Sequence, residues 1–111
     1  MDVKFKKTGS TLVVKMFGEL DHHAASFLRA KIDAKLNRSD IKNILFDFEG
    51  VNFMDSSGIG MILGRYKIVS LKSGKILACN LSPRLRRIFE MSGLLTKIAV
   101  FNSERDALTG A

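Results

Sequence analysis

The chain has 111 residues, of which 46% are hydrophobic and 26% charged, with one proline, one cysteine and a formal net charge of +7. This composition predicts one ordered globular domain and excludes a Pro-rich, disordered or internally disulfide-bonded chain. Its apolar runs are about five residues long, against the roughly twenty that span a bilayer, and its first residues lack the apolar segment of a signal peptide. We therefore expect a cytoplasmic protein that does not bind membranes.

The first third of the chain predicts a hairpin followed by a helix. Val3–Lys6 alternates apolar and polar residues, Thr8–Ser10 has turn composition, and Thr11–Phe17 is a second strand. Asp21 stands where a helix N-cap is expected, and the helix should end near Asn37. Its predicted apolar face consists of Ala24, Phe27, Leu28, Ala30, Ile32 and Leu36.

The middle of the chain predicts a second strand and helix pair. Ile41–Phe48 has the nearly continuous apolar character of a strand that is covered on both faces. A helix is expected from Gly58, with Ile59, Ile62, Leu63, Tyr66 and Val69 on its apolar face. Gly74 is suited to the left-handed backbone conformation that often follows the last residue of a helix.

The last third repeats the alternation. Lys75–Asn80 predicts a strand. A helix should follow it, with Ser82 as its N-cap and Pro83 at its first position, and Gly93 should end this helix. Lys97–Phe101 predicts a final short strand. Ser103 with Asp106 resembles a capping box for a last helix.

The predicted order of elements is β-β-α-β-α-β-α-β-α. Strands that alternate with helices after an initial hairpin favour an α/β domain with a mixed, mostly parallel sheet. We expect a single domain over residues 1–111, without an internal repeat.

Two composition features have ordinary explanations. Lys and Arg residues are spread along the chain, and the one dense cluster, Arg84, Arg86 and Arg87, has no interleaved aromatic residues. We interpret it as a solvated surface and expect no direct nucleic-acid partner. Cys79 lies in an apolar run without a nearby histidine or second cysteine, which favours a buried structural thiol and gives no metal site.

The junction Met54–Gly60 is the best candidate for a functional site, because it places Asp55, Ser56 and Ser57 between a strand and a helix. A nucleophilic serine would need a base, yet the only histidines are His22 and His23, and the Gly-x-Ser-x-Gly elbow is missing. Triad chemistry is therefore poorly supported, and we expect no enzyme.

Three further interpretations of this junction stay open. The glycines of Gly58–Gly64 match a dinucleotide-binding fingerprint poorly, since the third comes one residue late, and are better explained by a tight turn and close helix packing. Asp55, Ser56 and Ser57 could simply be competing N-caps. Alternatively, a serine here is the substrate of a kinase, because a helix N-terminus tolerates a phosphate. The exposed-looking pair Phe53–Met54 is followed by three residues that can cap a helix, which is more than capping needs. The capping interpretation and the kinase-substrate interpretation therefore both stay open.

Three segments together resemble a known family. They are Gly18–His23, Phe53–Lys67, and Ser82–Pro83 with Phe89–Leu94. These segments resemble the anti-sigma factor antagonists with the STAS fold, and Glu-Leu-Asp-His-His and Leu-Gly-Arg-Tyr-Lys point to the sporulation branch. The resemblance covers nearly the whole chain.

The resemblance implies a phosphorylation switch. The unphosphorylated protein would bind an anti-sigma factor that is also an ATP-dependent serine kinase, and would thereby release sigma F. The kinase would phosphorylate Ser56, and a metal-dependent, PP2C-type serine phosphatase would reverse the reaction. The implied partner surface comprises Asp21, Asp55, Ser56, Ser57 and Gly58. The resemblance implies neither a cofactor nor a metal in the protein itself, and it keeps nucleotide binding, to which members of the family have been linked, as a minor alternative.

Overall fold

A five-stranded sheet with four α-helices makes up the part of the chain that the computed structural model describes, residues 1–38 and 40–110. The elements in chain order are β1 (Asp2–Thr8), β2 (Thr11–Leu20), α1 (His22–Leu36), β3 (Asn43–Met54), α2 (Ser56–Leu71), β4 (Ile76–Cys79), α3 (Pro83–Ser92), a 3-10 turn η1 (Leu94–Thr96), β5 (Ala99–Phe101) and α4 (Glu104–Gly110). The predicted order of strands and α-helices is confirmed.

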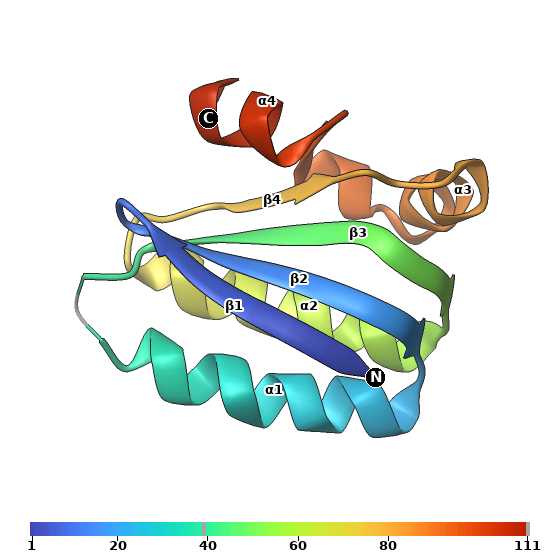
Figure 1. Cartoon of the computed structure of the whole chain (residues 1–111), viewed down its shortest axis with the longest axis horizontal. Coiled ribbons are helices and arrows are strands. Elements are labelled where there is room, and N and C mark those ends of the chain that lie inside the picture. The colour runs from blue at the N-terminus through green and yellow to red at the C-terminus, as the bar shows by residue number, and fades with distance from the viewer. Residues whose placement is uncertain (39, 111) are drawn as a thin grey trace.

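The strands lie side by side in the order β1-β2-β3-β4-β5. β1 pairs antiparallel with β2, and the three other pairings are parallel. The prediction of a mixed, mostly parallel sheet is therefore confirmed. Helices α1 and α2 cover one face of the sheet, α4 lies over the other, and α3 lies at one end (Figure 1).

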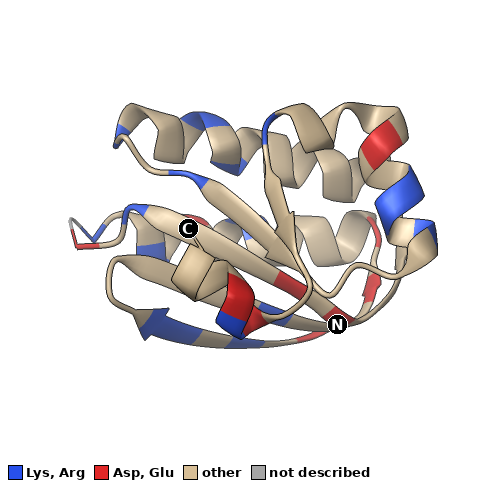
Figure 2. Ribbon diagram, turned by 90° about the horizontal axis from the view of Figure 1, so that it is seen from above, with Lys and Arg blue, Asp and Glu red and all other residues tan. Residues whose placement is uncertain are grey.

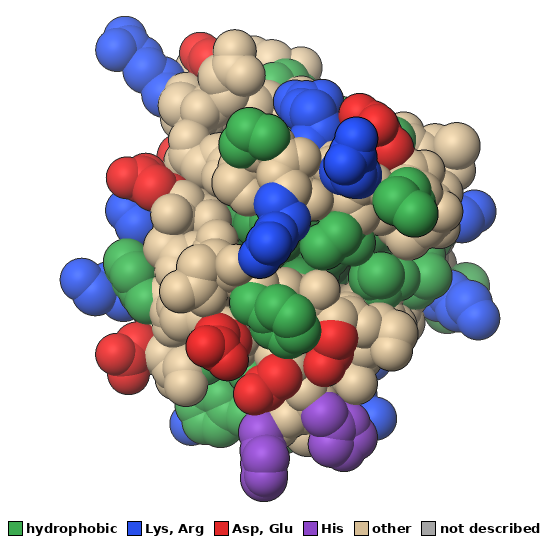
Figure 3. Space-filling model, turned by 90° about the vertical axis from the view of Figure 1, so that its right-hand side faces the viewer, with side chains coloured by type: hydrophobic (Ala, Val, Ile, Leu, Met, Phe, Trp, Pro, Cys, Tyr) green, Lys and Arg blue, Asp and Glu red, His purple; other side chains and the backbone are tan. Residues whose placement is uncertain are grey.

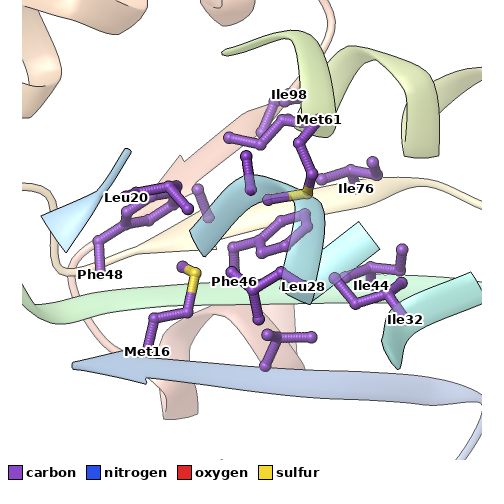
Figure 4. Close-up of a cluster of buried hydrophobic side chains, with 14 of the residues drawn as sticks. Met16, Leu20, Leu28, Ile32, Ile44, Phe46, Phe48, Met61, Ile76 and Ile98 are labelled. Atoms are coloured by element: carbon purple, nitrogen blue, oxygen red, sulfur yellow. The ribbon is translucent and has the colours of Figure 1, made fainter. Parts of the chain in front are cut away.

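The main core lies between the sheet and helices α1 and α2 (Figure 4). Alternate residues of β3, Ile44, Phe46 and Phe48, belong to this core and are at most 1% exposed. The residues between them face the other side, where Leu45 packs in a smaller cluster with Cys79 and Ala107. This explains why the strand shows almost no polar alternation: both of its faces are buried.

Several predicted caps are confirmed. Asp21 accepts a hydrogen bond from the backbone N–H of Ala24 at 3.0 Å, and Ser82 accepts one from Leu85 at 3.2 Å. Ser103 accepts one from Asp106 at 3.1 Å. Gly93 ends α3 in the left-handed region, with φ of 80°. Cys79 is buried as expected.

Some boundaries and faces were predicted wrongly. β3 runs on to Met54, well past Phe48, because its second half keeps pairing with β2 as far as Leu20. The last strand begins at Ala99 and not at Lys97, because the N–H groups of Lys97 and Ile98 still donate to the carbonyl oxygen of Leu94 in the turn that ends η1. On α1, Phe27 and Ala30 are exposed, since the buried stripe of the helix passes beside them.

The end of α2 also differs from the prediction. The left-handed residue is Ser73, with φ of 60°, and not Gly74. Gly74 is needed for a different reason: a Cβ atom there would collide with the carbonyl oxygen of Lys42. The glycine therefore permits two backbone segments to approach each other closely.

The positive charge is dispersed over the fold. Lys and Arg residues occur on strands, helices and connections, with acidic residues between them (Figure 2). Arg84, Arg86 and Arg87 are exposed on α3, where they line a shallow hollow together with Pro83 and Glu90. This arrangement is typical of a solvated surface.

Candidate functional site

Two helices begin next to each other at the carboxyl edge of the sheet. Leu20 and Met54 are paired residues at the ends of β2 and β3, and the N–H of Asp55 donates to the carbonyl oxygen of Leu20 at 3.4 Å. The chain then enters α1 after Asp21 and α2 after Asp55. The parallel pairing of β2 and β3 thus brings together two segments that are more than thirty residues apart in sequence.

Each of these helices has an aspartate as its N-cap. Asp55 Oδ1 accepts hydrogen bonds from the N–H groups of Ser57 at 2.9 Å and Gly58 at 3.4 Å. Helix α2 consequently begins at Ser56, two residues earlier than predicted. Asp55 alone supplies the side-chain cap, so the interpretation of three competing caps is wrong, and neither serine is needed for this purpose.

The two serines have different environments. Ser56 is exposed, and its hydroxyl makes no hydrogen bond within residues 1–38 and 40–110. Ser57 is half-buried, and its Oγ lies 3.4 Å from Nδ1 of His22 at the start of α1. Ser56 is therefore the more accessible hydroxyl, whereas Ser57 contacts the neighbouring helix.

Gly58 is buried and allows α2 to begin directly against the strand ends. A Cβ atom there would lie 2.7 Å from Met54 Cγ and 3.0 Å from Leu20 Cγ. Among the predicted partner-binding residues, Gly58 can thus shape the surface through the backbone but offers no side chain to a partner. Asp21 and Asp55 are both half-buried at the same edge.

The glycine run is not a phosphate-binding loop. Gly58, Gly60 and Gly64 all lie within α2, so their N–H groups are not arranged in a loop that could surround a phosphate. The expected close helix packing at Gly64 is also wrong, because a Cβ at Gly60 or Gly64 would meet no atom within 4 Å.

The sequence predicts no base near the serines, but in the structure His22 lies beside Ser57. This pair does not form a triad. Asp21 Oδ1 accepts from the Ala24 backbone, and no carboxylate in the described part of the chain is hydrogen-bonded to the His22 ring. A base that is not oriented by a third group is a poor activator of serine.

The surface around this edge combines apolar and acidic side chains (Figure 3). The two histidines lie at its rim, acidic side chains lie beside them, and a band of hydrophobic side chains crosses the face above. Phe53, at the end of β3, is 41% exposed, whereas Met54 is only 3% exposed. The prediction that both residues are exposed is therefore right for Phe53 and wrong for Met54. Exposed aromatic residues at a rim of polar groups are typical of protein interfaces.

Residues 1–38 and 40–110 contain neither a candidate metal centre nor a membrane-spanning helix. No group of three or more His, Cys, Asp or Glu side chains there is placed to hold a metal ion. None of the helices in these residues has both the length and the apolar character needed to cross a membrane.

Comparison with known proteins identifies the family. The STAS domain model matches residues 2–107. The chain belongs to the STAS-domain family. The anti-sigma F factor antagonist of Paenibacillus polymyxa is 35% identical over 109 residues, which cover 98% of this chain and 93% of that protein.

Solved structures agree with this assignment. The anti-sigma factor antagonist SpoIIAA in its unphosphorylated form is 31% identical, with a TM-score of 0.80, over 98% of this chain and 96% of that one. The phosphorylated form of Bacillus SpoIIAA, described as a cell fate determinant, is 36% identical, with a TM-score of 0.78, over 97% of both chains. The predicted STAS fold is confirmed. These relatives are regulatory proteins and not enzymes, which also confirms that expectation.

Proposed function

We propose that this STAS domain, over residues 1–111, is a cytoplasmic anti-sigma factor antagonist controlled by phosphorylation of Ser56. The unphosphorylated chain binds an anti-sigma factor that is also an ATP-dependent serine kinase, and binding releases sigma F. A PP2C-type serine phosphatase restores the unmodified form. The proposal is supported by the similarity to anti-sigma F factor antagonists and to SpoIIAA, which has been solved in both unphosphorylated and phosphorylated forms.

The observation that carries the proposal is the exposed Ser56 hydroxyl at the first residue of a capped helix. A phosphoserine adds about −1.5 to −2 charges at pH 7, and a helix N-terminus accommodates that charge favourably. Because Asp55 already caps the helix, a phosphate on Ser56 displaces no structural hydrogen bond. The modification therefore changes the surface and leaves the fold intact.

The same charge explains how binding is switched off. The Asp55 carboxylate, adjacent in sequence, repels the phosphate and directs it outward, into the space that the kinase occupies in the complex. The proposed contact surface consists of Asp21, Asp55, Ser56 and Ser57, held in place by the buried backbone of Gly58. A phosphate in its centre opposes binding by charge and by steric clash.

Titration calorimetry with the anti-sigma factor encoded in the same genome tests the proposal. Wild-type chain and Ser56→Ala should both bind, and Ser56→Ala should keep binding after incubation with ATP. Ser56→Asp should bind at least about tenfold more weakly, which corresponds to 1.4 kcal/mol. Ser70→Asp, on an exposed residue at the other end of α2, is the matched control and should bind like wild type. Failure of the unmodified wild-type chain to bind would overturn the proposal.

A further inference from the structure

A groove runs between α1 and α2 next to the proposed phosphorylation site. It has a volume of about 330 Å³ and opens to the surface. Its lining residues come from the first half of α1 and from the stretch 57–65 of α2: His22, Ala25, Ser26, Arg29, Ser57, Gly60, Met61, Gly64 and Arg65. No side chain fills the space above Gly60 or Gly64. The two glycines therefore keep the groove open, which accounts for them better than close helix packing.

Arg65 places a buried positive charge in the wall of this groove. The residue is only 7% exposed. Its Nε lies 2.9 Å from Asp33 Oδ1 without forming an aligned hydrogen bond, and its Nη1 donates to the carbonyl oxygen of Met61 at 3.4 Å. A buried guanidinium with incomplete hydrogen bonding is unfavourable unless a further acceptor reaches it.

A second arginine adds to this charge. Burial lowers the pKa of the Arg65 guanidinium, the carboxylate of Asp33 opposes this effect, and the positive charge of Arg29 lowers the pKa further. Arg29 and Arg65 both line the groove, and the Asp33 carboxylate lies beside Arg65. His22, Ser26 and Ser57 contribute further N–H or O–H donors at the same groove. The groove thus has an excess of positive charge and of hydrogen-bond donors.

We propose that an acidic side chain of the protein partner enters this groove and binds Arg29 and Arg65. The inference rests on the proposed function, because the partner is the anti-sigma factor itself. The guanidinium fork matches a carboxylate in shape and charge. Ser57 lines the groove and directly follows Ser56, so a partner that covers the phosphorylation site also reaches the groove.

This contact couples the groove to the switch. A phosphate on Ser56 adds negative charge next to the groove entrance, where it repels an approaching carboxylate and competes for Arg29. Phosphorylation therefore weakens the partner's contact in the groove as well as the contact at Ser56.

The test compares two charge reversals on α1 by titration calorimetry with the anti-sigma factor. Arg29→Glu reverses a charge in the groove, whereas Lys31→Glu makes the same change in net charge on an exposed residue that does not line it. Arg29→Glu should weaken binding at least about tenfold, and Lys31→Glu by no more than about twofold. Both residues are exposed, so both variants should keep the wild-type far-UV circular dichroism.

A second variant tests the volume of the groove without changing its charge. Gly64→Leu fills space in which a Cβ meets no atom, so the chain should fold normally and bind at least about tenfold more weakly. If wild type binds but Arg29→Glu binds no worse than Lys31→Glu, the inference is wrong while the proposed function stands. Binding of inorganic phosphate in the groove of the free chain, with the complex unaffected by Arg29→Glu, would likewise overturn it and assign the groove to a small anion.

Discussion

Nδ1 of His22 lies 3.4 Å from Oγ of Ser57, and this contact joins the first turns of α1 and α2. It leaves Ser56, the preceding residue, as the exposed serine of the pair. The pairing of β2 with β3 creates this difference between two adjacent serines, because it fixes where both helices begin.

Removing the cap of α2 should destabilise the domain. Asp55→Ala leaves the N–H groups of Ser57 and Gly58 without their acceptor and should reduce the free energy of unfolding by about 1 kcal/mol. Urea unfolding followed by circular dichroism measures the change. Asp55→Asn keeps a capping oxygen and should lose no more than a few tenths of a kcal/mol. Equal losses in the two variants would show that the carboxylate acts through its charge and not as a cap.

Two glycines of α2 should respond in opposite directions to the same substitution. Gly58→Ala forces a methyl group against Met54 and Leu20 and should reduce the free energy of unfolding by about 1–3 kcal/mol. Gly60→Ala places its methyl group in open space and should stabilise the helix by about 0.5–1 kcal/mol. The same urea titration distinguishes them. A stable Gly58→Ala variant would contradict the packing described for the start of α2.

Cys79 should be unreactive in the folded protein. Burial raises the pKa of its thiol from 9.0 to about 12, so the folded state disfavours the thiolate. Alkylation by iodoacetamide should therefore be slow in buffer and become fast as urea unfolds the chain.

The same shift has a consequence for stability. A folded-state pKa above the unfolded value gives a stabilising contribution that is complete below pH 9 and is lost as the pH rises toward 12. The free energy of unfolding should therefore fall more steeply above pH 9 in wild type than in Cys79→Ala. Parallel pH profiles of the two proteins would contradict this account.

The exposed Phe53 should contribute to partner binding and not to folding. Phe53→Asp should leave the free energy of unfolding within about 0.5 kcal/mol, because the residue is 41% exposed. It should weaken binding of the anti-sigma factor by about tenfold, since aromatic anchors carry much of the energy of an interface. Leu71→Asp, 89% exposed at the other end of α2, is the control and should bind normally. Normal binding by Phe53→Asp would place the interface elsewhere.

Local patterns were sufficient to predict most of the fold. Ile44–Phe48 is apolar because both faces of β3 are buried, and the caps at Asp21 and Ser82 lie where their side chains suggested. The start of α2 was misplaced because Asp55, Ser56 and Ser57 are all capable of capping a helix. Only the pairing of Met54 with Leu20 determines which of them does so.

The groove and its charge could not be predicted. They depend on how α1 and α2 pack against each other, and the spacing of Arg29 and Arg65 in sequence carries no information about that contact. Arg65 interrupts the apolar stripe of α2, and this was the one available signal of a buried cation. Its partner, Asp33, lies on a different helix. Similarly, neither the sequence around His22 nor the sequence around Ser57 indicates that these two residues lie side by side.

The most direct test of the central claim is to locate the phosphate. The purified chain would be incubated with the anti-sigma factor of the same genome and ATP, digested, and analysed by tandem mass spectrometry over residues 52–65. We expect one phosphate per chain on Ser56, full modification of Ser57→Ala and none of Ser56→Ala. Phosphate on Ser57 in the wild-type chain, or modification of Ser56→Ala at the wild-type rate, would contradict the account.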